Sequence, residues 1–305
     1  MNEQSQDSEM SFDRSFTGGP GELIRLSPLV RRMVAGNAGP MTFTGTCTYV
    51  VGNGEVAVID PGPDHPGHIA ALLAALRGES VTTILVTHTH RDHSPGARAL
   101  KAATGARIVG CPPRDFTPPL KGNTIDATHD SDYAPDQVMR DGDVIETANF
   151  SLVCVETPGH TRNHQAFALP QESTLFSGDH VMAWSTSVIT PPDGTMRQYM
   201  ASLEKLLARN DSIYWPGHGG PVSEPQRYVQ ALTRHRRARE NSIRARIEAG
   251  DTTIGTIVAN VYKGLDPMLT YAASLSVLAH LEDLVERGLV STEGAATLGA
   301  VYRPA

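Results

Sequence analysis

The feature that constrains this chain most is a run of three histidines and one aspartate within six residues: His88, His90, Asp92 and His93. Imidazole and carboxylate are ligands that divalent cations such as zinc prefer in proteins. The short apolar run 83–86 before it predicts a buried strand, and Ser94-Pro95 after it predicts the cap and first position of a helix. The cluster therefore lies on a turn between a strand and a helix, where α/β proteins place their chemistry. A chance cluster of surface histidines is the weaker alternative, because only 12 of the 305 residues are histidine.

The size and composition of the chain are those of an ordinary globular protein. Its 305 residues allow one large domain or two unequal ones, and 40% hydrophobic and 19% charged residues are typical of soluble proteins. The formal net charge of −7 argues against a surface that holds nucleic acid by electrostatics alone, but leaves room for a local basic cleft. The N-terminus does not resemble a signal peptide, and no apolar stretch approaches the ~18 residues of a membrane span. We therefore expect a soluble, cytoplasmic protein.

The three cysteines, Cys47, Cys111 and Cys154, are odd in number and far apart in the sequence. This spacing fits neither a disulfide framework nor a zinc knuckle. A reducing compartment is therefore the simpler assumption.

The chain divides into three expected regions. Residues 1–21 are polar and end in a Gly/Pro turn, which predicts a disordered tail. Residues 22–221 alternate strands and helices in two halves, the second more antiparallel, which is consistent with sheets sandwiched between helices. Expected strands are 46–51, 55–59, 83–86, 107–109, 151–156, 165–169, 174–176 and 212–215, and expected helices are 66–77, 95–103 and 198–208. The segment 111–136 is rich in Pro and Asp without a period, and such a long loop is usually functional or mobile.

Residues 222–305 have a different, mainly helical character. A long helix is expected at 225–248 with seven arginines, a short helix at 254–262, and a helix with an apolar stripe at 270–287. Segments 289–290 and 301–302 can form a hairpin, so this region reads as a winged helix. The arginine-rich helix 225–248 either has a solvated face with pairs such as Glu240 with Arg244, which we favour, or meets a nucleic acid or anionic substrate.

Three further candidate ligands repeat one local design. His160, Asp179 and His218 each follow a predicted strand and a glycine, as in Thr157-Pro158-Gly159-His160. Glycine lets the backbone turn sharply, so that the ligand projects from the end of the strand. One such turn alone is weak evidence, whereas four ligand-bearing turns at one edge of a sheet structure can converge on a single cleft.

These residues, in this order, resemble the motifs of the metallo-β-lactamase-fold hydrolases. The resemblance covers about residues 22–221 and extends to Asp60 in Ile59-Asp60-Pro61-Gly62, which looks like the first motif of that fold. It implies an α+β fold, an αββα sandwich, with two divalent metal ions. Zinc is the first expectation, with Mn²⁺ or Fe²⁺ as alternatives.

The resemblance also implies a role for each matching residue. Asp60 would orient a ligand imidazole without touching the metal. The implied metal ligands are His88, His90 and His160 for the first ion, Asp92, His93 and His218 for the second, and Asp179 as the bridge between them.

The residue at the second metal position distinguishes the branches of the family that the chain resembles. True lactamases typically use a cysteine there, whereas Asp92 looks like the glyoxalase II, nuclease and related branches. The winged helix and the segment 175–182 are similar to a narrower lactamase-beta-2-like subgroup, which includes a single-strand-RNA endonuclease. Cys47 departs from the asparagine expected at its position, but that position is not a ligand.

The expected activity is hydrolysis. Two divalent cations about 3.5–4 Å apart share a water and lower its pKa towards 7, which gives a bridging hydroxide. It would attack a carbonyl carbon or a phosphorus, and the metals would stabilise the oxyanion. Asp92 or Asp179 would take the proton, and the sequence does not decide between them.

Four other side chains each have two possible roles. His164 is either a group that supports the substrate or a ligand, or a packed and hydrogen-bonded histidine. Trp184, Met196 and Tyr199 either line the substrate pocket or belong to the apolar core.

The substrate stays open between an ester, a thioester and a phosphodiester. The acidity of the chain favours a small molecule such as an acyl thioester, while the subgroup favours single-stranded RNA, whose binding would depend strongly on salt. The sequence also leaves open whether the chain forms a homo-oligomer.

Two other functional classes fit the sequence less well. A flavodiiron-type redox protein usually has a glutamate in the second motif and a flavin domain. A non-catalytic winged-helix module would hold a structural metal, usually with cysteines.

Overall fold

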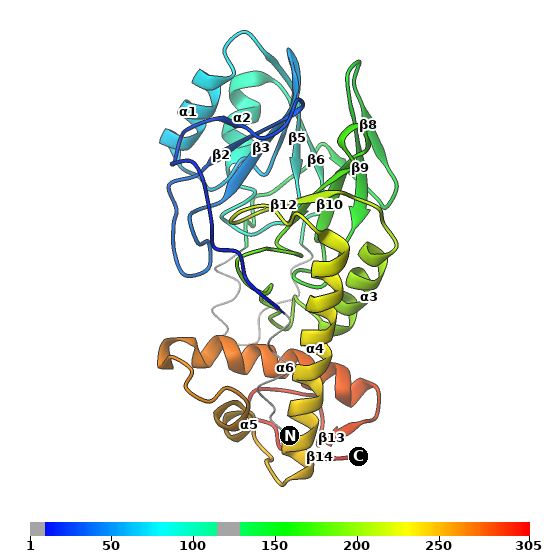
Figure 1. Ribbon diagram of the computed structural model, residues 1–305. Helices are drawn as coiled ribbons and strands as arrows, with labels where there is room; N and C mark the ends of the chain where they lie inside the picture. Colours follow the sequence, from blue (N-terminus) through cyan, green and yellow to red (C-terminus); the bar gives the residue numbers. More distant parts are fainter. Residues whose placement is uncertain (1–9, 115–128) are drawn as a thin grey trace.

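The computed structural model describes residues 10–114 and 129–305, and it forms a sandwich of two sheets with a helical region below it (Figure 1). Among the described residues, one sheet has seven strands in the order β1-β2-β3-β4-β5-β6-β7, and the other has five in the order β12-β11-β10-β9-β8. The first sheet contains β1 (Ile24–Arg25), β2 (Val30–Val34), β3 (Cys47–Asn53), β4 (Glu55–Ile59), β5 (Ser80–Val86), β6 (Arg107–Gly110) and β7 (Gln137–Val138). The second contains β8 (Val144–Glu146), β9 (Ser151–Glu156), β10 (Gln165–Leu169), β11 (Thr174–Gly178) and β12 (Ile213–Pro216).

The two sheets pack face to face because their strands are apolar on both sides. Along β4, Ala57 and Ile59 face the opposite sheet, while Val56 and Val58 face the outer helices. In β10, Phe167 faces the first sheet and Ala166 faces outward. Successive side chains of a strand point to opposite faces, so a fully apolar strand is expected only where both faces are covered.

Helices cover the outer face of each sheet. Helices α1 (Pro66–Ala75) and α2 (Gly96–Thr104) pack on the first sheet, and α3 (Met196–Leu207) packs on the second (Figure 1). The order of layers is therefore helix, sheet, sheet, helix, which confirms the αββα sandwich. In the second sheet β9, β10 and β11 are antiparallel, while β11 and β12 are parallel.

The N-terminal part of the chain corrects two expectations. Strand β2 was missed, because Arg31 and Arg32 interrupt its apolar pattern. Arg31 is nevertheless paired with Glu79 at 2.6 Å, and the Arg32 guanidinium lies 4.1 Å from the Phe16 ring centroid. Phe16 itself packs against the core between the sheets, and Asp13 N–H donates to the Ala183 carbonyl. The expected tail 1–21 is thus wrong from residue 10 onward, and residues 1–9 lie outside the described residues.

Two further differences lie near the segment 111–136. Its middle, residues 115–128, lies outside the described residues, and the short strands β7 and β8 that follow the segment were not predicted. Helix α2 begins one residue later than expected, with Pro95 at the cap and no side-chain capping bond. The Ser94 hydroxyl instead donates to Asp130 Oδ2 at 3.0 Å, because this long-range partner competes with the local cap.

The C-terminal region is a winged helix, as expected. It comprises α4 (Pro225–Glu248), α5 (Ile254–Val261), α6 (Thr270–Glu286) and an antiparallel hairpin of β13 (Val290–Thr292) and β14 (Tyr302–Pro304). The beginning of α4 packs on the sandwich through Val229 and Leu232, and its end packs in the helical region through Ile243 and Ile247. The boundary expected at residue 221 therefore falls just before a helix that both regions share (Figure 1).

Several arginines of α4 are neutralised by nearby carboxylates. Arg237 pairs with Glu204 of α3 at 3.3 Å. The expected pair of Glu240 with Arg244 is wrong: Glu240 contacts Arg287 of the α6 end at 2.6 Å, and Arg244 lies 3.9 Å from Glu248. Packing of α6 against α4 offers Glu240 a partner that the local spacing does not reveal. None of the described helices, α4 included, is both long and apolar enough to cross a membrane.

Candidate metal centre

Four turns at one edge of the sandwich bring the candidate ligands together. The turn after β5 carries His88, His90, Asp92 and His93, while the turns after β9, β11 and β12 carry His160, Asp179 and His218. All seven side chains fall into two groups whose ligand atoms lie within 4.8 Å of one another. The first group is His88, His90, His160 and Asp179, and the second group is Asp92, His93 and His218.

Glycine is required where these turns meet. A Cβ atom at Gly217 would lie 2.4 Å from Asp179 Oδ1 and 2.7 Å from His93 Cε1. Gly178 has a φ of +50°, and a Cβ atom there would lie 2.5 Å from His164 Nε2. A larger residue at either position would therefore push a candidate ligand or its neighbour out of place.

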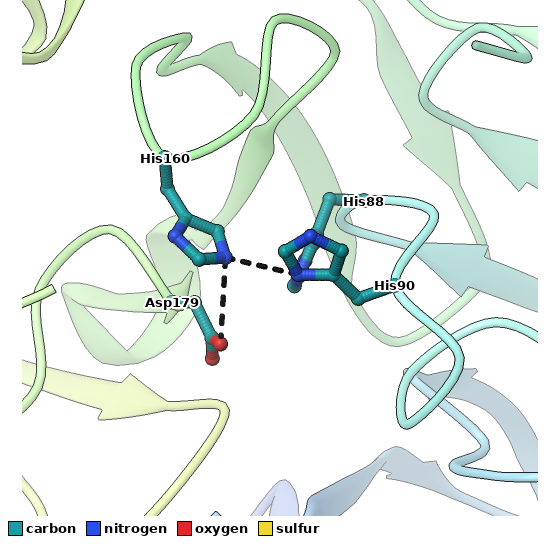
Figure 2. Close-up of side chains that lie close together, drawn as sticks. All are labelled: His88, His90, His160 and Asp179. Carbon is teal, nitrogen blue, oxygen red and sulfur yellow. Dashed lines mark hydrogen bonds and ion pairs between the residues drawn. The ribbon is translucent and has the colours of Figure 1, made fainter. Parts of the chain in front are cut away.

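The first group directs three imidazoles and a carboxylate towards one point (Figure 2). His90 Nδ1 lies 3.0 Å from His88 Nε2 and 3.1 Å from His160 Nε2. Asp179 Oδ2 lies 3.7 Å from His160 Nε2. The side chains come from three different turns, so only the folded sandwich assembles them.

The second group is equally close-packed. His218 Nε2 lies 3.1 Å from Asp92 Oδ2 and 3.3 Å from His93 Nε2. The Asp92 side chain is 27% exposed, whereas the two histidines are fully buried. Asp92 therefore lies at the open side of the group.

Asp179 touches both groups. Its Oδ1 lies 3.5 Å from His93 Nε2, and its Oδ2 lies 3.4 Å from His218 Nε2, in addition to the contact with His160. Within the described residues, the buried Oδ1 has no hydrogen-bond partner. In the first group, His90 Nδ1 and each neighbouring imidazole nitrogen about 3 Å away can share one proton at most, so this group has more acceptors than donors. The residues present thus fit divalent cations that bind nitrogen and oxygen ligands.

Two imidazoles of the first group, those of His88 and His90, are held neutral. Burial lowers the pKa of His88 well below its ordinary value, and the neighbouring His93 and His90 lower it further. Burial, His160 and His129 likewise lower the pKa of His90. A neutral imidazole has a free lone pair, which is the form that binds a metal.

The imidazoles of the second group are held protonated in the metal-free chain. Burial would lower the pKa of His218, but the Asp179 and Asp92 carboxylates raise it to about 9. Burial also opposes the charge on His93, yet Asp92, Asp179 and Asp60 raise its pKa well above the ordinary value. Conversely, the pKa values of Asp92 and Asp179 lie well below their ordinary value: burial would raise them, but His93 and His218 outweigh it.

Asp60 lies behind the second group, where it contacts an imidazole on the side away from the other candidate ligands. Its Oδ2 accepts a hydrogen bond from His93 Nδ1 at 2.9 Å, and its Oδ1 accepts one from the Thr87 backbone N–H at 2.8 Å. The carboxylate is only 2% exposed. This geometry fixes which His93 nitrogen faces His218 and Asp92.

His164 lies against Asp179 from behind. Its Nε2 accepts a hydrogen bond from the Asp179 backbone N–H at 3.1 Å, and its Nδ1 lies 2.8 Å from the Thr157 hydroxyl. The ring is 1% exposed, so it is packed and hydrogen-bonded beside the candidate ligands. Burial and the nearby His180 and His160 hold its pKa well below the ordinary value, which keeps Nε2 an acceptor.

The three apolar candidates for a pocket divide between two environments. Met196 and Tyr199 are fully buried in the core beneath α3, so the core alternative holds for both. Trp184 is half-buried and stacks on Phe43 with ring centroids 5.0 Å apart.

Two residues near the site had no sequence signal. His129 Nε2 lies 3.3 Å from Asp193 Oδ2, and with His90 they form a further group of close ligand atoms. His129 stands in the irregular segment 111–136, and Asp193 follows two prolines without a strand before it. Arg114 Nε lies 3.6 Å from Asp193 Oδ1, so a positive charge is already present there.

Comparison with known proteins covers both parts of the chain. Residues 41–218 match the model of the metallo-beta-lactamase superfamily, and residues 253–297 match the beta-lactamase associated winged helix domain. The chain is 32% identical over 282 residues to the beta-lactamase-like protein 2 homolog of Drosophila melanogaster, covering 87% of this chain and 91% of that protein. It is 33% identical over 229 residues to an atrochrysone carboxyl ACP thioesterase of Aspergillus fumigatus, covering 73% of this chain and 66% of the relative.

A solved structure extends the likeness to nearly the whole chain. A beta-lactamase domain protein from Burkholderia ambifaria superposes with a TM-score of 0.79 at 18% identity, covering 99% of this chain and 100% of that one, which shows a shared fold. The superfamily match and the Drosophila relative each cover more than half of the chain. The chain therefore belongs to the metallo-beta-lactamase superfamily of hydrolases and carries a C-terminal beta-lactamase associated winged helix domain.

Proposed function

We propose that this chain is a dinuclear metal-dependent hydrolase of acyl thioesters. The first group without Asp179 would hold one cation, the second group would hold the other, and Asp179 would bridge them. One observation carries the proposal: the Asp179 carboxylate lies within 3.7 Å of imidazoles from both groups, with one buried oxygen that has no hydrogen-bond partner among the described residues. With a single metal ion, the other group of closely packed imidazoles and carboxylates would have no cation to bind.

The residues divide the chemistry between them. When bound, two divalent cations supply Lewis acidity and a water of lowered pKa, the source of the hydroxide nucleophile. Asp92 is the better proton acceptor of the two carboxylates, because it is 27% exposed at the open side of the second group, whereas Asp179 is 9% exposed. Five imidazoles and two carboxylates suit zinc best, although Mn²⁺ and Fe²⁺ accept the same ligands.

A thioester is the substrate class best supported. The Aspergillus relative is named as an ACP thioesterase, and the match covers 73% of this chain and 66% of that relative. Single-stranded RNA is less favoured, since the net charge is −7 and Arg237 and Arg246 of α4 are already paired with carboxylates.

A hydrolysis panel tests the proposal. Purified chain would be assayed with S-acetyl-N-acetylcysteamine, S-lactoylglutathione, p-nitrophenyl acetate, bis-p-nitrophenyl phosphate and a fluorescent single-stranded RNA, each before and after chelation. We expect chelator-sensitive thioester hydrolysis, abolished in Asp179→Ala and retained in Asp64→Ala, a control at an exposed carboxylate. Cleavage of the RNA and of no thioester would show that the substrate is RNA and refute the proposed thioester substrate. Turnover that is unaffected by complete metal removal would refute the proposed metal-dependent hydrolysis.

A further inference from the structure

We propose that Arg236, on the winged-helix side of the chain, is a positioning residue for the metal centre. It holds the segment Ser187-Val188, and this segment holds two members of the first group, Asp179 and His160. The inference rests on the proposed role of these two side chains as metal ligands. It makes helix α4 part of the hydrolytic site, although no candidate ligand lies on α4.

Three hydrogen bonds connect the arginine to the first group. Arg236 Nη2 donates to the Ser187 carbonyl. The Ser187 hydroxyl donates to the Asp179 carbonyl at 2.6 Å. One residue further, the Val188 carbonyl accepts from His160 Nδ1 at 2.7 Å. The bond to Nδ1 leaves His160 Nε2 directed towards His90 and Asp179, as Figure 2 shows.

The environment of Arg236 indicates more than packing. The residue is 4% exposed, and its guanidinium lies 5.1 Å from the Tyr199 ring centroid. Tyr199 in turn donates to the carbonyl of His180, the residue after Asp179. Burying a cation is costly unless hydrogen bonds compensate, and an apolar side chain of similar volume would pack here at lower cost. The arginine is therefore best explained by the carbonyl that it fixes.

Helix α4 delivers the arginine through its packing. Val229, Leu232 and Arg236 are spaced by three and four residues, so they lie on one face of the helix. The first two belong to the same buried core as Tyr199 of α3. Docking of this apolar face therefore carries Arg236 against the segment behind the first group.

Metal affinity tests the inference without relying on turnover. Zinc would be titrated into the full metal-free chain in competition with a chromophoric chelator, for wild type, Arg236→Met and Arg236→Lys. Loss of residues that orient metal ligands typically weakens binding 10–100-fold, and we expect about that loss at one of two sites in Arg236→Met, partly restored by lysine. Arg239→Met is the matched control, because Arg239 stacks 4.2 Å from the Tyr262 ring centroid within the winged helix. Its zinc affinities should equal those of wild type.

A second variant keeps the test decisive if Arg236→Met does not fold. Ser187→Ala removes the hydroxyl that supports Asp179, and it should weaken zinc binding at the same site. In the double variant the losses should not add, because both residues act through one segment. Unchanged zinc affinities in Ser187→Ala, or lower thermal stability of Arg236→Met without a change in zinc affinity, would overturn the inference. If wild type binds two zinc ions but hydrolyses no ester, only the proposed activity fails.

Discussion

The two ligand groups contain similar side chains but hold their protons differently. In the first group burial dominates, and the pKa values of His88 and His90 lie well below the ordinary value. In the second group the carboxylates outweigh burial, and the pKa of His218 is raised to about 9. The difference follows from where the carboxylates lie: Asp92 and Asp60 contact the second group only, while Asp179 lies between the two. Before metal binds, protons therefore take the place of a cation in the second group alone.

This asymmetry predicts an order of metal binding. The neutral His88 and His90 can accept a cation without losing a proton, whereas a cation entering the second group must displace protons held there by the raised pKa values of His93 and His218. At neutral pH the first group should therefore load before the second.

Asp179→Ala should have the largest effect, because it removes the carboxylate that contacts imidazoles of both groups. Both zinc affinities should fall, and turnover should drop by more than the roughly 10–100-fold typical of residues that only orient a ligand. Zinc content by mass spectrometry and thioester turnover measure this. Full activity would refute the bridging role.

Asp92→Ala should separate the groups. It removes a carboxylate from the second group only, so zinc content should fall from about two ions to about one, with most of the turnover lost. Equal loss from both sites would show that the groups do not bind independently. A control at the exposed Asp64 should keep both ions.

Binding at the second group should depend on pH, with affinity rising as the pH rises. Because carboxylates raise the pKa values of His93 and His218, the second group carries protons at pH 7 that a cation must displace, and binding there should release more protons than binding at the first group. Each displaced proton contributes up to about tenfold in affinity per pH unit. The increase should weaken above about pH 9, where His218 is already neutral. Titration calorimetry in buffers of different ionisation enthalpy counts the released protons. Equal proton release at both sites would contradict the inferred difference in protonation between the two groups.

Asp60→Asn should have the smallest effect, about a tenfold weaker second site. The substitution keeps the size of the side chain but removes the charge that accepts the His93 Nδ1–H bond. Asparagine also tolerates the left-handed backbone of this position, with φ +48°, so the fold should persist. Chelator competition should show the first site unchanged, and weakening of the first site alone would contradict the assignment of Asp60 to the second group.

Local patterns in the sequence determined the strands that end at the site and the candidate ligands themselves. Each candidate ligand stands in a turn that follows a strand, and a glycine such as Gly217 precedes several of them. These signals operate over a few residues, so they survive without knowledge of the fold. The alternation of apolar strands and helices in the same way predicted the sandwich and the winged helix.

The tertiary structure alone decided which distant partners complete these local elements. Strand β2 contains two buried arginines whose partners lie elsewhere in the sequence: Arg31 pairs with Glu79, and Arg32 lies over the Phe16 ring. Asp193 and His129 meet from two irregular segments. Arg236 reaches Ser187 across 49 residues, only because the apolar face of α4 docks on α3. A local pattern sets how the backbone turns, whereas packing of whole elements chooses what each turn meets.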